Sequence, residues 1–299
     1  MSITLVAVVV ALVLGHVAPA LVTAARRYAW YGSWLRWLGA QSGEGGFWHG
    51  RYGIAMALLP PVLVVALLQW MLHSPLFLVG LLGLLFGIAT LVYAWGPRDL
   101  DVDVEAIIDA NDAASRREAI ARLWPIGEPV AGDGPALVGA VFRNALHRWF
   151  GVLFWFLLLG PAGAVLYRLT AFSAEGEYAS ALPSETLAGA RVLFAVLDWP
   201  VAQLMTLSMA LVGNFDAVFN AWREAQGNQW QLDSAFLGAA ARASVRSELA
   251  EEAEEYAEEG MVQAMRELPE LRDAMSLVWR ILLLWLAVLA LFVIAGWVS

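Results

Sequence analysis

Four long stretches without a charged residue constrain this chain more than any other feature of its sequence. They cover residues 2–25, 52–97, 149–167 and 281–299. A helix needs roughly 20 apolar residues to cross a bilayer, and apolar runs of this length are typical of such helices. The sequence therefore predicts an all-α, polytopic integral membrane protein. A hydrophobic share of 60% agrees, since soluble domains average about 45–50%.

We expect about six transmembrane helices, within a range of four to six, together with helical cytoplasmic segments. The expected spans are residues 3–25, 52–72, 75–95, 149–169, 187–212 and the last part of 277–299. This divides the chain into an N-terminal membrane region (1–97), a cytoplasmic helical segment (98–148), a membrane helix pair (149–213), an acidic cytoplasmic segment (214–276) and a C-terminal span (277–299). Within the first region, the aromatic loop 26–51 is expected to lie on the headgroups.

The arginines set the expected orientation. If 187–212 crosses the membrane, sixteen of the 18 basic residues fall on one side, and only Arg168 and Arg191 fall on the other. The positive-inside rule therefore favours that crossing and makes the arginine-rich side cytoplasmic. We expect a multi-pass protein of the bacterial inner membrane, with both termini in the periplasm and an outer loop at 173–186.

The composition excludes several kinds of site. The chain has no cysteine, which removes disulfides, thiolate metal sites and cysteine nucleophiles. All 18 basic residues are arginine, so a lysine-dependent Walker A loop and Schiff-base chemistry are excluded. The four histidines lie in separate segments, and we predict no metal site. A net charge of −9 argues against nucleic acid as a partner, because phosphate backbones bind basic surfaces.

An acidic run follows the third expected span. Arg98, Asp99, Asp101 and Asp103 are the candidate ligand-binding residues there. Oxygen-rich clusters of this kind can hold Mg²⁺ together with a phosphate. The alternative is that Pro97 begins a helix whose first-turn acids complement its dipole. The glutamates of 247–260 are interpreted as a solvated helix face, with cation binding as the alternative.

Two further groups could carry a function. Asn144, His147 and Arg148 lie at the cytoplasmic mouth of the fourth span, where Arg148 could contact a ligand or anchor the helix. Asp198 lies inside an expected span, where an ionisable group normally faces a partner or a wet cavity. Arg191, seven residues earlier on the same helical face, is its candidate partner. The alternative is that Asp198 caps a helix resuming at Pro200.

Several motifs resemble those of the AmpE family. They are Arg148–Phe156, Gly160–Ala164, Tyr167–Arg168, Leu197–Pro200, Gly213–Asp216, Ala221–Arg223 and Gly96–Leu100. AmpE is an inner-membrane protein associated with the regulation of β-lactamase induction. The resemblance implies a signalling modulator in the response to cell-wall damage and antibiotics, with a cytoplasmic or membrane protein partner in cell-wall recycling.

AmpE in turn resembles, more distantly, the CobD/CbiB cobinamide-phosphate synthases, membrane enzymes that use ATP. Their motif runs roughly Glu-Asn-Thr-Ser-Asp-Gly before a Phe-Trp pair. Counted back from Phe154-Trp155, Asn144 matches the asparagine. Arg143, Leu146 and His147 stand where the motif has glutamate, serine and aspartate. These departures remove most of the acidic and hydroxyl groups of the motif.

Three functions remain open from the sequence. The first is a regulator without catalytic activity and without a resident cofactor, which binds a ligand or partner on the cytoplasmic side. The second is an ATP- and Mg²⁺-dependent ligase-like enzyme that uses the acidic run. The third is a small-solute transporter with Arg191 and Asp198 along its path. The missing motif groups favour the first over the second, and the absence of a visible inverted repeat disfavours the third.

Overall fold

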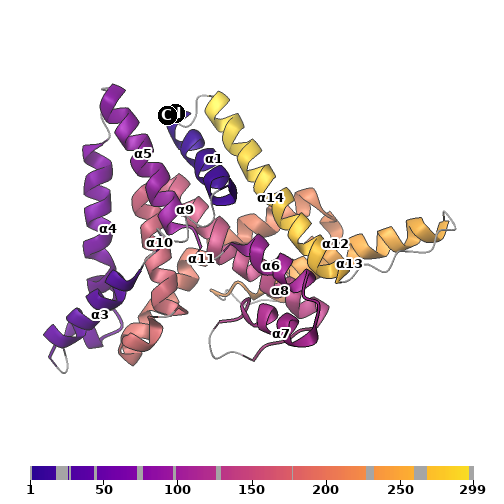
Figure 1. Cartoon of the computed structure of the whole chain (residues 1–299), viewed down its shortest axis with the longest axis horizontal. Coiled ribbons are helices and arrows are strands. Elements are labelled where there is room, and N and C mark those ends of the chain that lie inside the picture. Colours follow the sequence, from indigo (N-terminus) through magenta and orange to yellow (C-terminus); the bar gives the residue numbers. More distant parts are fainter. Residues whose placement is uncertain are drawn as a thin grey trace. The chain divides into compact units, whose positions relative to one another are not determined.

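The protein is entirely helical wherever its structure is described. This computed structural model describes residues 2–17, 26, 28–43, 46–72, 77–96, 99–125, 129–176, 178–226, 232–258 and 268–295, and no strand occurs in them (Figure 1). Three described helices are long and apolar enough to cross a bilayer, namely Ile54–Met71, Ser184–Val212 and Pro269–Ile294. The shorter apolar helices are Leu5–Leu14 and Val79–Ala94. The prediction of an all-α membrane protein is confirmed.

The chain divides into two units. Unit 1 comprises residues 1–97, 147–197 and 289–299, and unit 2 comprises 98–146 and 198–288. The helices of unit 1 are α1 (Ser2–Val17), α3 (Ala29–Gln41), α4 (Ile54–Met71), α5 (Phe77–Ala94), α9 (Gly151–Leu159) and α10 (Pro161–Ala174), with short turns η1 (Phe47–His49) and η3 (Ala179–Ala181). The first part of α11 (Ser184–Val212) and the end of α14 (Pro269–Ile294) complete it.

The centre of unit 1 is α10, which contacts α4, α5 and α9, while α1 lies along α5 (Figure 1). The predicted helix pair within 52–95 corresponds to α4 and α5, and its turn at 73–76 lies outside the described residues. At 1.5 Å per residue, each of these 18-residue helices extends about 27 Å, close to the thickness of a bilayer core. Leu59, Leu63 and Leu67 are exposed along α4, as expected for a surface that faces lipid.

The segment 149–169 differs from the single span that we expect from its hydropathy. The helix breaks at Gly160, whose φ of +70° is open mainly to glycine, and Pro161 begins a new helix. The two helices fold back on each other and pack closely. There is no room for a side chain at Gly163, where an added Cβ would lie 2.2 Å from the carbonyl oxygen of Trp155. With nine residues, α9 extends only about 14 Å and cannot cross the bilayer. The hairpin therefore ends on the side where it begins.

This reversal also corrects the expected placement of Arg168, Arg191 and the loop 173–186. The Arg168 guanidinium donates to the carbonyl oxygen of His147, at the start of the hairpin. Thr186 donates to the carbonyl oxygens of Trp48 and Gly50, in the segment assigned to the cytoplasmic side. The predicted outer loop thus lies beside a predicted inner one. The single helix expected over 149–169 is wrong, because hydropathy detects apolar length and does not detect a reversal within it.

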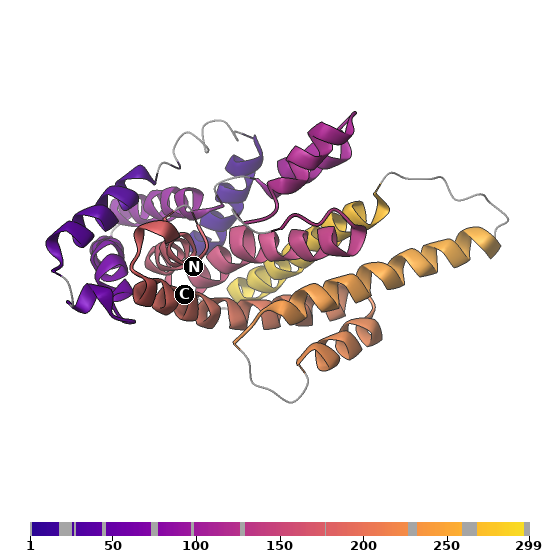
Figure 2. The same ribbon diagram turned by 90° about the horizontal axis from the view of Figure 1, so that it is seen from below.

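Unit 2 contains α6 (Leu100–Ile108), α7 (Ala113–Ala121), α8 (Gly134–Ala145), α12 (Phe215–Gln226) and α13 (Ala235–Glu258), with the second part of α11 and most of α14. In its core α13 contacts α8 and α12, and α6 contacts α7 and α8 (Figure 2). Gly139 and Gly238 allow α8 and α13 to approach closely, since a Cβ on Gly238 would lie 3.7 Å from the Gly139 Cα. Asp112 caps α7 by accepting from two backbone amides.

Candidate functional site

The candidate residues fall into both units. In unit 1 they are His147, Arg148 and Arg191. In unit 2 they are Asp99, Asp101, Asp103, Asn144 and Asp198. Arg98 lies outside the described residues.

The carboxyl end of α5 is the organising feature of unit 1. The last carbonyls of a helix have no partner within the helix, and cations stabilise this negative end. Arg26 donates to the carbonyls of Val92 (3.0 Å) and Gly96, and Tyr28 donates to that of Tyr93. These contacts satisfy carbonyl groups that α5 leaves open.

Arg168 completes this arrangement. Its side chain is 3% exposed, and its Nε donates to the Ala94 carbonyl at 2.6 Å. Its Nη2 donates to the carbonyls of His147 (3.2 Å) and Arg148 (3.4 Å). The sequence analysis placed Arg168 on the far side and did not identify it as a site residue. No local signal marks it, because its partners are backbone groups 20 to 74 residues away along the chain.

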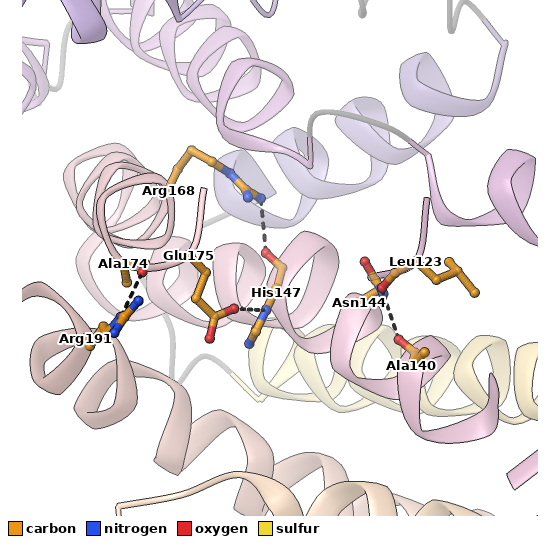
Figure 3. Close-up of polar contacts among 8 residues, drawn as sticks. All are labelled: Leu123, Ala140, Asn144, His147, Arg168, Ala174, Glu175 and Arg191. Carbon is orange, nitrogen blue, oxygen red and sulfur yellow. Dashed lines mark hydrogen bonds and ion pairs between the residues drawn. The ribbon is translucent and has the colours of Figure 1, made fainter. Parts of the chain in front are cut away.

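Residues 146–150 form a π-helix, η2 (Leu146–Phe150), between α8 and α9. Short π-helical segments are rare and frequently occur at functional sites. His147, within it, places Nδ1 3.7 Å from Oε2 of Glu175, at the end of α10 (Figure 3). Its ring also contacts Phe194 at 4.8 Å between centroids. The half-buried imidazole and the exposed carboxylate thus join the two ends of the hairpin.

Arg148 is nearly buried, at 8% exposure. The backbone amide of Gly96 donates to its carbonyl at 3.2 Å. A Cβ on Gly96 would lie 2.6 Å from the Arg148 Cβ, so this approach requires glycine. The motifs around Gly96 and Arg148, distant in sequence, are therefore in direct contact.

Two phenols beside this centre remain hydrogen-bond donors over the physiological range. Burial raises the pKa of Tyr31 to about 12, although its hydrogen bond with Ser173 opposes the shift. Burial also raises the pKa of Tyr28 well above its ordinary value. Both hydroxyls stay protonated over the physiological range, and that of Tyr28 donates to the last turn of α5.

Arg191 and Asp198 are both on α11 but have different surroundings. Arg191 is exposed and directs Nε at the Ala174 carbonyl, 3.4 Å away (Figure 3). Asp198 is buried, at 4% exposure, and Pro200 follows it within the same uninterrupted helix. Since α11 runs from residue 184 to 212 without a break, the alternative in which Asp198 caps a resuming helix is wrong.

The acidic run of unit 2 forms the first turns of α6. Asp99 occupies the cap position, and Asp101 accepts a hydrogen bond from the indole nitrogen of Trp279 at 3.0 Å. Asp103 is 2% exposed, whereas Glu105 is exposed. These carboxylates therefore occupy different environments. In the described part of the chain, no group of three or more histidine, aspartate and glutamate side chains is placed to hold a metal ion.

Asn144 joins two helices of unit 2. Its side-chain amide donates to the carbonyls of Leu123, after α7, and Ala140, one turn back in α8, both at 2.8 Å (Figure 3). Both amide protons are thus used within the protein. The residue that matches the synthase motif holds the fold together at this point.

A polar cluster in unit 2 was missed by the sequence analysis. Arg280 of α14 donates to Oε2 of Glu248 at 2.6 Å and to the Val212 carbonyl at 3.3 Å. Ser244 is fully buried beside them. The Ser244 Oγ lies so close to Gly213 that a Cβ added there would be 2.6 Å away. Glu248 belongs to the acidic stretch that we interpreted as a solvated face. That interpretation holds for Glu254 and Glu255, which are exposed, and is wrong for Glu248.

Gln69 is a second residue that the sequence analysis missed. From α4 it contacts both sides of the hairpin turn, donating to the Leu159 carbonyl at 3.3 Å and accepting from the Ala162 amide at 3.2 Å. A cavity of about 350 Å³ lies beside it. Its lining is mostly apolar and comprises Val62, Ala66, Gln69, Trp70, Leu159, Ala162, Gly163 and Leu166. A polar residue within an apolar span is the only signal that could have identified Gln69.

Comparison with known proteins gives two similar chains. The cobalamin biosynthesis protein CobD of Chromobacterium violaceum is 29% identical over 196 residues, which span 62% of this chain but only 59% of that protein. The CobD of Stutzerimonas stutzeri is 28% identical over 271 residues, 86% of this chain and 85% of that protein. No family model matches the chain. No solved structure matches it either.

Proposed function

We propose that this chain is a regulatory membrane protein of the AmpE type, which acts in β-lactamase induction on a scaffold similar to that of CobD. In this proposal it resides in the bacterial inner membrane and binds a ligand or a protein partner on its cytoplasmic side. The similarity to two CobD proteins supports the scaffold. The AmpE-like motifs support the regulatory role.

The observation that carries the proposal is how the side chains of residues 143–147 are used, since this segment corresponds to the synthase motif. Asn144 directs its amide at backbone carbonyls, and Leu146 is fully buried. Arg143 and His147 stand where the motif has acids, and His147 lies near Glu175. Acids and hydroxyls that could bind Mg²⁺ or a phosphate are thus replaced by groups that hold helices together.

The responsive element in this proposal is the π-helix η2. It leads from α8 into the hairpin, and Arg168 fixes two of its carbonyls. A ligand that displaces the Glu175 carboxylate from His147 would change how the hairpin is anchored. Arg148 and Arg191 supply positive charge for an anionic ligand in the same unit.

A complementation pair tests the proposal directly. A bacterial strain that lacks its own CobD and needs cobalamin for growth receives either this chain or, as positive control, the Stutzerimonas stutzeri CobD. We expect growth with the control alone. In a second strain that carries an inducible β-lactamase reporter, deletion of this gene should shift the β-lactam dose that gives half-maximal induction. An unchanged dose response would contradict the regulatory role.

A second candidate function is favoured by the names of both relatives. It is an ATP- and Mg²⁺-dependent ligation, with Arg98, Asp99, Asp101 and Asp103 at the nucleotide. Ligand binding stabilises the native state by mass action. A rise in melting temperature with Mg-ATP that disappears in the double variant Asp99→Asn/Asp103→Asn, together with growth in the complementation test, would establish it. Anhydro-muropeptides and corrinoids in the same thermal screen separate a sensor from an enzyme.

A further inference from the structure

The helix α12 carries an exposed row of aromatic side chains. Phe215 and Phe219 are 53% and 43% exposed, and their rings are stacked at 5.8 Å and 7°. The ring of Trp222 follows at 5.7 Å from that of Phe219. The spacing of i, i+4 and i+7 places the three on one face of the helix, which we call the aromatic face.

The rest of α12 divides into a packed side and a polar side. Val218 is fully buried, and α12 contacts α13 (Figure 2). Asp216, Asn220 and Arg223 are exposed and lie on the opposite side from Val218. The aromatic face lies between these two sides. A helix that is packed on one side, polar on another and aromatic between them suits a boundary between lipid and water.

An exposed apolar surface of the same unit precedes the aromatic face along the chain. Directly before α12, the candidate span α11 exposes Leu204, Leu207 and Leu211, at 40%, 55% and 65%. A polar contact marks the end of this apolar surface. Arg280, which precedes the uncharged run 281–299, donates to the carbonyl of Val212. Phe215 is the third residue after Val212, so α12 begins where two apolar segments reach their polar ends.

We propose that α12 lies in the plane of the bilayer interface, with its aromatic face among the first acyl carbons and its polar side in water. Amphipathic aromatic residues concentrate at this depth in membrane proteins. The indole nitrogen of Trp222 donates to Gln203 of α11 at 3.1 Å and so links the two helices. This surface is independent of the proposed regulatory function. It anchors unit 2 to phospholipid at a second place besides its spans.

The test uses the full chain, which contains no cysteine and so needs no background substitutions. The single variants Phe219→Cys and Asn220→Cys are labelled with a nitroxide and reconstituted into phosphatidylcholine/phosphatidylglycerol vesicles. The collision rates of each label with oxygen and with a water-soluble nickel chelate are measured by electron paramagnetic resonance. We expect the oxygen-to-nickel ratio to be several-fold higher at position 219 than at position 220. The variant Phe215→Cys provides a second label on the aromatic face.

Two results would overturn the proposal. Equal and high nickel accessibility at both positions would place α12 in water. Protection of the position 219 label from both reagents would show that a protein surface, such as a second copy of the chain, covers the aromatic face. The thermal transition of each labelled variant, followed by tryptophan fluorescence, verifies that the fold is retained. If Phe219→Cys loses that transition, the label at Phe215→Cys is compared with the label at position 220 instead.

Discussion

The two units satisfy their polar groups in different ways. In unit 1, the buried or half-buried arginines Arg26 and Arg168 donate to main-chain carbonyls at the ends of helices. In unit 2, most of the described side-chain hydrogen bonds between distant segments join two side chains. Examples are Arg280 with Glu248, Trp279 with Asp101, Asn214 with Glu251 and Trp285 with Ser208.

The difference follows from where helices end. In unit 1 the last carbonyls of α5 lie against other parts of the unit, where Arg26, Tyr28 and Arg168 donate to them. An arginine can satisfy several of them at once because it has five donors in a fixed fork. Unit 2 instead joins distant segments through pairs of side chains such as Arg280 with Glu248. We therefore expect unit 1 to depend on single residues and unit 2 on pairs.

The largest effect should follow from Arg168→Met. The change removes the donors to three buried carbonyls, and a hydrogen bond to a charged group contributes about 1.5–3 kcal/mol. The free energy of unfolding, measured in detergent by tryptophan fluorescence, should fall by at least about 3 kcal/mol. Arg168→Lys should lose less, since one ammonium can still donate. Arg36→Met is the matched control, because the exposed Arg36 donates to Ser33 within its own helix. A loss at Arg168 as small as that at Arg36 would contradict the comparison.

Gly160→Ala should have the next largest effect. A φ of +70° with a ψ of −157° is open almost only to glycine, so alanine there costs about 1–3 kcal/mol. Its Cβ would also lie 2.5 Å from the side-chain nitrogen of Gln69, which contacts the hairpin turn. Gly80→Ala serves as control, since no atom lies within 4 Å of the added Cβ. Equal thermal stability of the two variants would show that the hairpin does not need this backbone conformation.

A smaller effect is expected from Glu248→Gln in unit 2. The pair with Arg280 is partly exposed, at 23% and 39%, so solvent screening limits its contribution to about 1 kcal/mol or less. The loss should shrink as salt rises from about 0.01 to 1 M, because the Debye length falls from about 30 to 3 Å. The loss at Arg168, which donates to three backbone carbonyls and is almost fully buried, should change less with salt. A double-mutant cycle with Arg280→Gln isolates the energy of the pair. If the stability losses of the Glu248 and Arg168 variants depended equally on salt, the distinction between the two units would be contradicted.

The smallest effect concerns Asp112, the exposed cap of α7. Its hydrogen bonds from the Ser115 hydroxyl and backbone amide, and from the Ala114 amide, lower its pKa below the ordinary value of 3.8. A lowered pKa in the folded state means that the cap stabilises α7 above pH 3.8, and this stabilisation is lost as the pH falls through the folded value. Asp112→Asn should keep a cap while removing this pH dependence. Hydrogen exchange of the α7 amides between about pH 6 and 3 measures the difference. Identical profiles for wild type and variant would contradict it.

Part of the fold could be predicted from residues alone. The pair α4 and α5 follows from an uncharged stretch too long for one span and a proline after a short polar break. The predicted helix with acids in its first turn is found as α6, which begins at Leu100 and carries Asp101 and Asp103 there.

The candidate site was predicted less well. Asn144 and Arg148 were identified by position, but their contacts could not be inferred, because Asn144 donates to backbone carbonyls and Arg148 is contacted through its own carbonyl. Glu248 was assigned to a solvated face with its neighbouring glutamates, since nothing in a run of acids marks the one that meets Arg280. Gln69 and Arg168 were not proposed as site residues, because a single polar residue in an apolar stretch does not identify its partner.

The sequence by itself determined that this protein is helical and lies in a membrane, because the transfer of apolar side chains from water depends on composition and length and not on neighbours. It also excluded cysteine and lysine chemistry outright. Only the tertiary structure decided that 149–174 is a hairpin, that Arg168 lies beside Arg148, and that α12 exposes its aromatic face. These features depend on one glycine torsion and on backbone groups distant in sequence. Their energies exist only once the chain has folded.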